Sequence, residues 1–323
     1  MKAFLCKEYG PPESLVLEEV PDPQAGPGQV VVDIKSCALN FPDALMIENK
    51  YQFKPELPFA PGGEIAGVVS AVGAGVSDLS VGDRVAAGIG NGGFAEKIAI
   101  KADQALKIPD GLDNNTASAF MTTYGTTQYA LNDRGDLKPG ETLLVLGASG
   151  GVGMAAIELG KVMGARVIAA ASTAEKLAIC KEAGADELIN YNTEDLKNRT
   201  KELTGGKGAD VVYDAVGGDY AEAALRATNW GGRFLVIGFV AGIPSIPLNL
   251  TLLKSCDVRG VFYGALKARD PKRGDEIMQE IVDLLTAGKI KPYISATYSL
   301  DNAAQALRDM VDRKVTGKVV VTI

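Results

Sequence analysis

Residues 142–153 read Thr-Leu-Leu-Val-Leu-Gly-Ala-Ser-Gly-Gly-Val-Gly and decide the fold of this chain. The first five are an apolar run of the length of one buried parallel strand. Glycines crowd the rest, and an apolar pattern of helical period begins at Val152. A strand, a glycine-rich turn and a helix start together make a phosphate site. The glycines let a pyrophosphate approach the backbone, and the helix N-terminus offers unpaired N–H groups.

This stretch departs from plain G-x-G-x-x-G spacing, and a glycine turn with a purely structural role is the alternative. The sequence that follows favours a ligand. Residues 165–171 (Ala-Arg-Val-Ile-Ala-Ala-Ala) are typical of the next strand, which completes a βαβ unit of the size of a dinucleotide half-site. We therefore expect the cofactor to contact Ser149, Gly150, Gly151 and Val152.

Composition limits the class of protein. The chain has 323 residues, 46% of them hydrophobic and 23% charged, which is typical of a soluble globular protein with room for two domains. A net charge of −7 disfavours nucleic acid or an anionic membrane as the main partner. We expect a cytoplasmic protein, because there is no signal peptide or long apolar run and the four cysteines are scattered without C-x-x-C. No histidine is present, which excludes Ser-His-Asp triads and histidine metal sites.

The order of patterns predicts an α/β protein with two domains. Residues 1–110 are short alternating segments broken by Gly and Pro, typical of a β-barrel. From residue 142 strands alternate with helices, which predicts a parallel sheet covered on both faces. Because the last residues return to strand pattern, we expect a barrel domain from 1–124 and 266–323 and a Rossmann domain from 125–265. The expected strands of the parallel sheet are 142–147, 165–171, 187–191, 209–215, 232–238 and 257–263, and the expected helices are 114–131, 152–163, 173–183, 194–203, 219–228, 274–287 and 303–311.

Five motifs, in this order and spacing, resemble a known family. They are Ala-Leu-Asn-Phe-Pro-Asp (38–43), Pro-Gly-Gly-Glu-Ile-Ala-Gly (61–67), Val-Gly-Asp-Arg-Val (81–85), the glycine turn (147–153) and Val-Val-Tyr-Asp-Ala-Val-Gly (211–217). The chain resembles the zinc-independent medium-chain dehydrogenase/reductase superfamily, in its quinone oxidoreductase (zeta-crystallin-like) group. The resemblance implies a doubly wound Rossmann domain and a GroES-like barrel, with the active site between them, and a homodimer. The apolar strand expected at 257–263 also favours a dimer, because an unpaired sheet edge is usually covered.

The same resemblance allows a prediction about zinc binding. Zinc members of the superfamily carry a cysteine where this chain has Asn40 and a histidine where it has Gly63. Their structural zinc lobe is rich in cysteine, whereas residues 88–100 here contain none. Since a zinc site needs three or four converging S, N or O ligands, we expect no metal.

The end of the second parallel strand predicts the cofactor. NAD-specific sites place an acidic residue there to bind the ribose hydroxyl, but this chain has Ala-Ala-Ser-Thr at 170–173. Ser172 and Lys176 offer a 2′-phosphate charge-assisted hydrogen bonds, and Tyr191 matches a family tyrosine that covers this phosphate. We expect NADP rather than NAD. The alternative is that Ser172 caps the helix and Lys176 lies on a solvated face.

The nicotinamide end is inferred mainly from the resemblance. It places Asn40 and Thr127 along the nicotinamide and substrate site, and Val216 in the cofactor site. Four further residues follow later strands at their carboxyl ends, where ligands of such sheets bind: Gly238, Phe239, Phe262 and Tyr263. Core packing is the alternative for the two phenylalanines.

Tyr51 is the main candidate for chemistry beyond hydride transfer. It stands where related enoyl and quinone reductases carry a tyrosine near the substrate. A neutral phenol could stabilise a substrate oxygen that becomes anionic when hydride arrives. Packing of a half-buried tyrosine is the alternative.

The expected activity is NADPH-dependent hydride transfer to a quinone or to an alkene conjugated with a carbonyl, and the sequence leaves these two open. An enoyl thioester is the second substrate class. A basic entrance with Lys267, Arg269, Lys272 and Arg273 would favour it, although these charges could equally form a solvated loop. A third possibility is an NADPH-binding interaction protein with little turnover.

Overall fold

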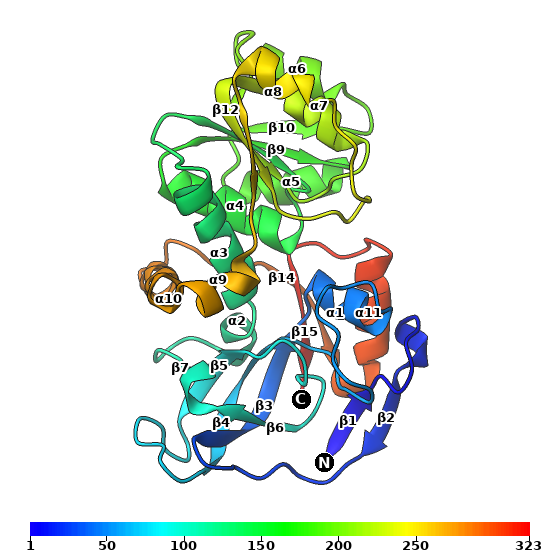
Figure 1. The fold of residues 1–323 in the computed structure, drawn as a ribbon, viewed down its shortest axis with the longest axis vertical. Coiled ribbons are helices and arrows are strands. Elements are labelled where there is room, and N and C mark those ends of the chain that lie inside the picture. Colours follow the sequence, from blue (N-terminus) through cyan, green and yellow to red (C-terminus); the bar gives the residue numbers. More distant parts are fainter. The chain divides into compact units, whose positions relative to one another are not determined.

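The computed structural model describes residues 1–323 and divides into two compact units (Figure 1). One unit comprises residues 1–122 and 292–323, and the other residues 123–291. The first unit is thus built from both ends of the chain, as the strand pattern of the last residues indicated. Residues 266–291 belong to the second unit, whereas the sequence analysis placed them in the barrel domain.

Polar contacts explain why residues 266–291 lie in the second unit. They hold helix α10 (Pro271–Thr286). The Arg273 Nε atom lies 3.0 Å from Asp133 Oδ2, and the Gln128 side-chain amide donates to Glu280 at 2.6 Å. Both partners of α10 belong to the second unit. The amphipathic pattern of this helix predicts that one of its faces is buried. The pattern does not indicate which domain covers that face.

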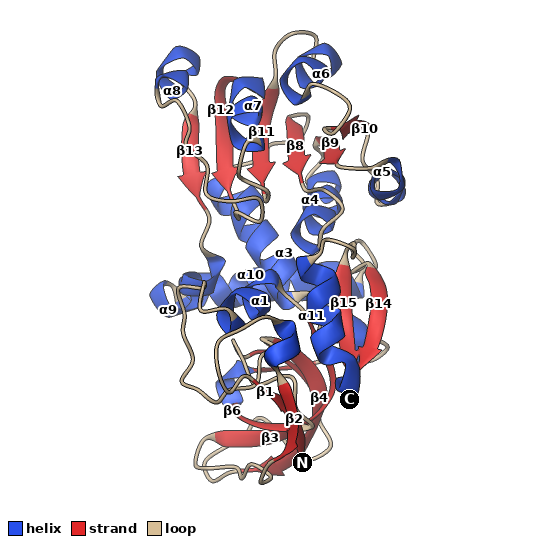
Figure 2. Ribbon diagram, turned by 90° about the vertical axis from the view of Figure 1, so that its right-hand side faces the viewer, coloured by secondary structure: helices blue, strands red, loops and turns tan.

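The second unit is built on a six-stranded parallel sheet with the order β10-β9-β8-β11-β12-β13, seen in Figure 2. This is the doubly wound Rossmann order, and the point where the order reverses lies between β8 and β11. The strands are β8 (Thr142–Leu146), β9 (Arg166–Ala171), β10 (Glu187–Asn190), β11 (Ala209–Asp214), β12 (Thr228–Val236) and β13 (Asp257–Gly260). The helices are α3 (Met121–Gln128), α4 (Gly151–Val162), α5 (Ala174–Glu182), α6 (Leu196–Leu203), α7 (Tyr220–Ala227), α8 (Asn249–Lys254), α9 (Leu266–Arg269) and α10.

The first unit contains a seven-stranded sheet with the order β14-β15-β3-β4-β5-β7, in which β6 also pairs with β3, and a separate β1-β2 hairpin. The C-terminal strand β15 lies antiparallel to β3, with Val320 opposite Ala38. This pairing brings the two chain ends into one core. The elements are β1 (Lys2–Leu5), β2 (Val16–Glu19), β3 (Gln29–Ala38), α1 (Phe41–Ile47), β4 (Glu64–Val72), β5 (Arg84–Gly88), β6 (Lys97–Lys101), β7 (Ala105–Lys107), α2 (Asn114–Ala117), β14 (Ile294–Ser299), α11 (Ala303–Val311) and β15 (Lys318–Thr322).

The main error lies in the expected helix 114–131. It is broken into α2, α3 and a π-helical segment, Tyr129–Arg134. Gly125 within α3 is required by packing, because a Cβ atom there would lie 2.5 Å from the ring of Tyr263. The strand expected at 257–263 ends at Gly260, so Tyr263 follows the strand. The sequence analysis also missed β7, β14, α8 and α9, all of six residues or fewer. No helix is long and apolar enough to cross a membrane.

Candidate functional site

The glycine turn joins β8 to α4 at the point where the strand order reverses. Gly147 has a φ of +66°, and a Cβ atom there would lie 2.9 Å from Val216 Cγ2. A Cβ atom on Gly153 would lie 2.3 Å from the carbonyl oxygen of Gly147. Both positions therefore need glycine because the chain passes close to itself. Gly150 differs, since a Cβ atom there would only be in ordinary contact with the turn.

The amino end of α4 is open to an anion. Its N-cap is Gly150, which has no side chain to accept from the first turn, and the helical bonding starts at the N–H of Met154. The N–H groups of Gly151 and Val152 thus point out of the helix end, where the helix dipole is positive. Ser149 is buried beside them. The structure therefore brings together the four residues expected at the pyrophosphate, and a diphosphate fits them chemically.

The neighbouring loop after β11 is held by Asp214. Its Oδ1 atom accepts from the N–H groups of Val216 and Gly217, both at 2.9 Å. Burial raises the pKa of this carboxyl group, and the two backbone hydrogen bonds oppose the rise. The loop is therefore fixed against the glycine turn through the Val216–Gly147 contact. Val216 is therefore held beside the glycine turn, and its expected contact with the cofactor stays a prediction.

The end of β9 carries no carboxylate. Thr173 is the N-cap of α5, and its side chain accepts from the N–H of Lys176 at 3.3 Å. The alternative that Ser172 caps this helix is therefore wrong, because the chain starts the helix one residue later. The nearest acid, Glu175, is exposed in the first turn, where hydrogen bonds from its own backbone and from Thr173 lower its pKa.

Two residues that the sequence analysis missed complete this region. The side-chain amide of Asn192 donates to the Ser172 carbonyl at 2.9 Å, and the Tyr220 hydroxyl donates to Asn192 Oδ1 at 3.3 Å. Tyr191 packs on Tyr220. Ser172, Tyr191, Asn192 and Tyr220 thus form one cluster at the ends of β9 and β10. Only the position of Asn192 beside Tyr191 could have signalled its role.

The residues after β12 and β13 divide into two kinds. Phe239 and Phe262 are 46% and 55% exposed, so the core-packing alternative is wrong for both. Tyr263 packs against Gly125, and its ring centroid lies 6.4 Å from that of Tyr129. The N–H of Gly238 donates to the Asp214 carbonyl at 3.3 Å, which joins the ends of β11 and β12.

Thr127 is fully buried. Its hydroxyl lies 2.9 Å from the Tyr213 hydroxyl and donates to the carbonyl of Thr123 at 2.8 Å. The carbonyl oxygen of Val152 lies 3.4 Å from the same hydroxyl oxygen. The structure therefore shows Thr127 joining α3 to β11 and α4. Its expected contact with the nicotinamide stays a prediction.

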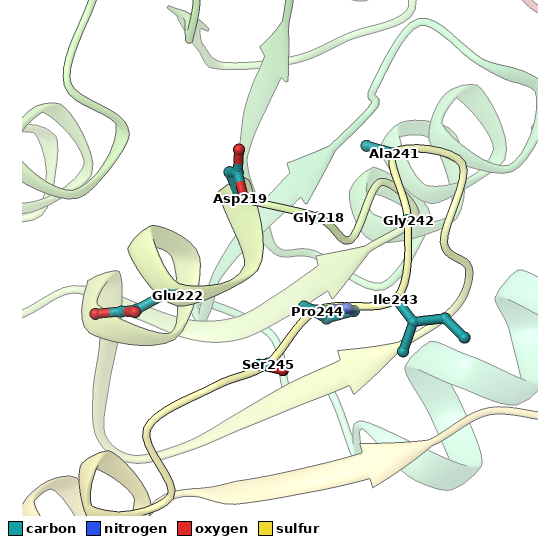
Figure 3. A pocket seen from close by; sticks show the side chains of 8 residues that line it. All are labelled: Gly218, Asp219, Glu222, Ala241, Gly242, Ile243, Pro244 and Ser245. Atoms are coloured by element: carbon teal, nitrogen blue, oxygen red, sulfur yellow. The ribbon is translucent and has the colours of Figure 1, made fainter.

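A separate pocket of about 350 Å³ lies between the loop before α7 and the loop after β12 (Figure 3). Two of its lining residues, Asp219 and Glu222, are acidic. These carboxylates would repel a phosphate, so we do not assign the pyrophosphate to this pocket. The other lining residues are Gly218, Ala241, Gly242, Ile243, Pro244 and Ser245.

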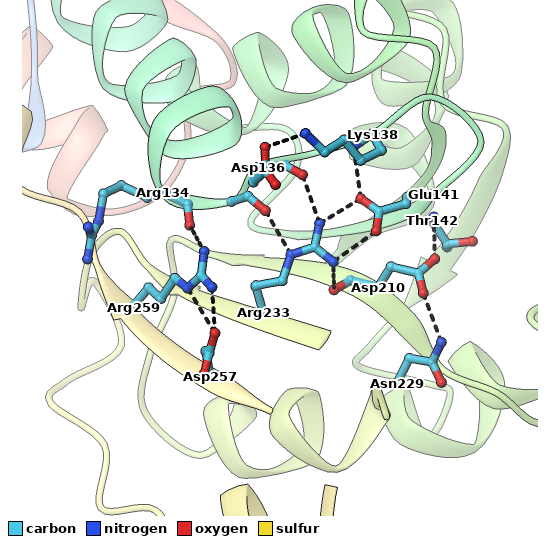
Figure 4. Close-up of polar contacts among 11 residues, drawn as sticks. Arg134, Asp136, Lys138, Glu141, Thr142, Asp210, Asn229, Arg233, Asp257 and Arg259 are labelled. Atoms are coloured by element: carbon cyan, nitrogen blue, oxygen red, sulfur yellow. Dashed lines mark hydrogen bonds and ion pairs between the residues drawn. The ribbon is translucent and has the colours of Figure 1, made fainter. Parts of the chain in front are cut away.

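Paired charges lie at the amino ends of the parallel strands, at the end of the sheet opposite the glycine turn (Figure 4). Arg233 forms a bidentate pair with Glu141, with N–O distances of 2.9 and 2.6 Å. Its Nη2 and Nη1 atoms also donate to the carbonyls of Asp136 and Asp210. This end holds the starts of the strands together and leaves the arginine no free donor pair for a ligand.

In the first unit, Asn40 lies in a buried polar cluster. It is the N-cap of α1. The Asn40 Nδ2 atom donates to Glu64 Oε2 at 2.9 Å, and Oδ1 accepts from the Lys318 ammonium at 2.7 Å. Lys318 also donates to the Leu39 carbonyl at 2.8 Å and lies 3.3 Å from Glu64. The sequence analysis missed Lys318 and Glu64 as partners of Asn40.

Asp43 borders this cluster. Its carboxylate accepts from the N–H groups of Asn40 at 2.7 Å and Gly62 at 3.3 Å. Burial raises the pKa of Asp43 to about 7, although these hydrogen bonds and the charge of Lys318 oppose the rise. The group thus fixes the entry of α1 rather than offering a free base.

Tyr51 is half-buried and packs on the barrel core. Burial raises the pKa of its phenol, and the charge of Asp43 raises it further. No group of the chain forms a hydrogen bond with this hydroxyl, so a neutral donor is available at this position. The ring of Tyr51 can therefore pack on the core while its hydroxyl remains available as a hydrogen-bond donor.

Comparison with known proteins agrees with this architecture. Residues 26–110 match the family described as "Alcohol dehydrogenase GroES-like domain", and residues 151–286 match "Zinc-binding dehydrogenase". The chain is 42% identical to "Quinone oxidoreductase-like protein 2 homolog" of Nematostella vectensis, over 99% of this chain and 88% of that protein. It is 34% identical to "Quinone oxidoreductase" of Pseudomonas aeruginosa, over 97% of each. The chain belongs to the quinone oxidoreductase group of the medium-chain dehydrogenase/reductase superfamily.

A solved structure shows the same fold. The crystal structure of Escherichia coli quinone oxidoreductase complexed with NADPH superposes with a TM-score of 0.93 at 31% identity, and covers the whole of both chains. The doubly wound sheet and the GroES-like domain of this quinone oxidoreductase-like chain are thereby confirmed.

Zinc, which one family description mentions, does not fit the residues of this family member. The Asn40 side chain is bound to the ammonium of Lys318, a cation that would repel a metal ion. At Gly63 the chain offers no ligating side chain, and a Cβ atom there would already be in tight contact with the Gly90 carbonyl oxygen, at 3.0 Å. Cys37 is buried, and burial raises its thiol pKa well above the usual range, which disfavours the thiolate that zinc requires. No group of three or more His, Cys, Asp or Glu residues could hold a metal.

Proposed function

We propose that this protein is an NADPH-dependent reductase that transfers hydride to a quinone or to an α,β-unsaturated carbonyl compound without a metal ion. The observation that carries the proposal is the end of β9. It presents Ser172 and Lys176 beside Tyr191 and lacks the carboxylate that would select NAD. A 2′-phosphate would gain charge-assisted hydrogen bonds there.

The rest of the cofactor would lie along the carboxyl ends of the parallel strands. The open N-terminus of α4 would bind the pyrophosphate, and Val216 would lie beside it. The E. coli relative, whose structure contains NADPH, supports this cofactor. When bound, NADPH supplies the hydride. The chain would bind and orient the cofactor and exclude water from the site.

Asn40 and Tyr51 would act on oxygen atoms of the ligands. Both present a hydrogen-bond donor: Asn40 through its amide nitrogen, and Tyr51 through a phenol whose pKa is raised by burial. Hydride addition to a conjugated carbonyl places negative charge on its oxygen. A positioned neutral donor stabilises that charge without a metal.

The enoyl-thioester alternative is weakened by the charges of the segment that was to favour it. Lys267 lies 3.8 Å from Asp275, and Lys272 lies 3.8 Å from Glu276. Arg273 is also paired with acidic groups. Three of the four positive charges thus have an acidic neighbour within the second unit, whereas Arg269 forms no ion pair. A phosphorylated thioester carrier would find less attraction there than the sequence indicated.

We further propose a cytoplasmic homodimer. The edge strand β13 has a free side, and the exposed apolar residues of this region, Leu252 and Leu253 among them, favour burial by a second copy.

An oxidation assay tests the activity. NADPH and NADH are each mixed with quinones, enones, enals and enoyl thioesters, and loss of absorbance is recorded. We expect turnover with NADPH and with quinones or enones. Turnover restricted to enoyl thioesters would identify the second substrate class, and tight NADPH binding without turnover on any acceptor would support the interaction protein.

A further inference from the structure

The buried Lys318–Glu64 pair is the most connected polar feature of the first unit. Both side chains are almost fully buried and 3.3 Å apart. The antiparallel register of β15 and β3, with Val320 opposite Ala38, sets Lys318 opposite Asn40. Residues 278 positions apart in the sequence are thus brought into one hydrogen-bonded group.

Every strong donor and acceptor of the pair is used. Lys318 has three N–H donors, and it has three acceptors: the Leu39 carbonyl, Asn40 Oδ1 and Glu64 Oε2. Glu64 accepts in addition from the Asn40 amide and, through Oε1, from the N–H of Thr122 at 3.1 Å. Such saturation is what allows an ion pair to be buried.

The two charges decide which way the Asn40 amide points. An ammonium can only donate, so it faces the amide oxygen, and a carboxylate can only accept, so it faces the NH₂ group. Turning the amide by 180° would set NH₂ against the ammonium and oxygen against the carboxylate. Because the surroundings are buried, both repulsive contacts would be strong. The two charges therefore fix the orientation of the amide.

The Asn40 side chain does more than cap its helix. An N-cap asparagine usually directs its oxygen to the first turn of its own helix, whereas Asn40 Oδ1 accepts from the Lys318 ammonium. Its NH₂ group has two donors, of which Glu64 takes one. The second has no acceptor within the chain, and the side chain is only half-buried.

We infer that Lys318 and Glu64 are positioning residues that hold Asn40 as a hydrogen-bond donor toward a carbonyl oxygen of the bound ligand. The inference rests on the proposed function. There, two oxygens have this chemistry: that of the nicotinamide carboxamide and that of the carbonyl acceptor. The pair turns the amide oxygen toward the Lys318 ammonium and leaves the second N–H of the amide for a ligand acceptor.

The first test is NMR of the cofactor-free protein labelled with ¹⁵N-asparagine, in which Asn40→Ala identifies the Asn40 side-chain signals. One Nδ2 proton should lie at low field, because it is bonded to a buried carboxylate. The double variant Lys318→Met/Glu64→Gln removes both charges together, and in it this proton should return to the range of exposed asparagines. Lys318→Arg, which keeps the charge and the donors, should retain the shift. Lys35→Met, an exposed lysine of the adjacent strand β3, is the matched control and should change nothing.

The second test is a mutant cycle with the holoenzyme. Asn40→Ala should lower kcat or raise the Kd for NADPH by about 10-fold or more in the wild-type background, the scale on which misplaced groups act. In the double-variant background the same change should cost almost nothing, because the orientation is already lost. A lower affinity for NADPH would assign the nicotinamide oxygen, and a lower kcat with unchanged affinity would assign the acceptor oxygen.

Two results would overturn the inference. One is an Asn40 signal that stays in place in the double variant, and the other is a cost of Asn40→Ala that is equal in both backgrounds. If the double variant does not fold, Glu64→Gln alone serves, and an unshifted signal there contradicts the inference equally. The NMR test needs no cofactor, so it still decides the positioning role if the chain proves not to use NADPH.

Discussion

The ring of Tyr220 packs against that of Tyr191 with centroids 4.5 Å apart and planes at 48°. A tilted pair at this distance is favourable beyond its buried area. It fixes Tyr191 directly after β10, beside Asn192, which is bonded to the Ser172 carbonyl. Tyr220 begins α7, so this helix and the residues after β9 and β10 form one cluster.

The first prediction concerns cofactor choice. Lys176→Ala should weaken NADPH binding by about 1–3 kcal/mol, the scale of a hydrogen bond to a charged group, and leave NADH nearly unchanged. Titration calorimetry with both cofactors measures this. Lys207→Ala, an exposed lysine of the same unit before β11, is the control and should affect neither. Equal losses for NADPH and NADH would show that Lys176 does not bind the 2′-phosphate.

The second prediction is that activity needs no metal. Asn40, whose side chain is bound to the Lys318 ammonium, and Gly63, which has no side chain, stand where metal ligands would be needed. Turnover should survive long dialysis against a chelator, and elemental analysis should find no stoichiometric zinc. One equivalent of tightly held zinc would contradict this prediction.

The third prediction concerns assembly through β13. Val258 is partly exposed on this edge strand, and Leu252 and Leu253 of α8, which precedes the strand in the chain, are also exposed. Val258→Lys should shift the protein from dimer to monomer, because a charged edge resists pairing. Light scattering at micromolar concentration measures the mass. Val162→Lys, equally exposed on α4, is the matched control and should leave the mass unchanged. A wild-type mass of 33.7 kDa would refute the dimer.

The fourth prediction follows from Asp43. Burial raises its pKa to about 7 in the folded protein, from 3.8. The folded state therefore binds more protons than the unfolded state between these values, so this group's contribution to stability is full at low pH and is lost as pH rises toward 7. The free energy of unfolding should fall relative to Asp43→Asn by up to about 1.4 kcal/mol per pH unit in this range. Urea unfolding of both proteins from pH 5 to pH 8 measures the difference, and a constant difference would contradict the assignment.

The sequence predicted the fold well where local patterns are strong. The run at 142–146 is completely apolar apart from Thr142, and the structure makes it the central strand β8. The lack of an acidic residue at the end of β9 could also be predicted, because it is read directly from the sequence. The short strands and helices were not predicted because their residue patterns do not differ from those of loops. In the helix expected at 114–131, the need for glycine at position 125 depends on Tyr263, which is distant in the sequence, and the divisions after Ala117 and Gln128 were not predicted.

The partners of the site residues could not be predicted for the same physical reason. Nothing near Asn40 in the sequence indicates Lys318, since their contact requires the register of β15 on β3. Likewise, the stacking of Tyr220 on Tyr191 requires the crossing of α7 back to the sheet. Sequence motifs therefore predict candidate site residues, and only the tertiary structure shows the residues that hold them in place.

The last prediction concerns Tyr51. Its hydroxyl has no partner within the chain, and burial and the charge of Asp43 raise its pKa, so the phenol stays protonated at neutral pH. If it stabilises charge on the acceptor oxygen, Tyr51→Phe should lower kcat for enones by about 10²-fold, the usual value of such a donor. The affinity for NADPH should not change. A quinone accepts hydride readily and needs the donor less, so its reduction should fall much less.

Packing provides the control for this prediction. The phenylalanine ring fills the same place against the barrel core, so the Tm should barely move. Tyr9→Phe removes another partly exposed hydroxyl of the same unit and should leave both activities intact. The ratio of enone to quinone turnover is the decisive measurement, because a general loss of structure would lower both alike. An unchanged ratio would assign Tyr51 to packing, and the acceptor oxygen would then have to be stabilised by Asn40 or by water.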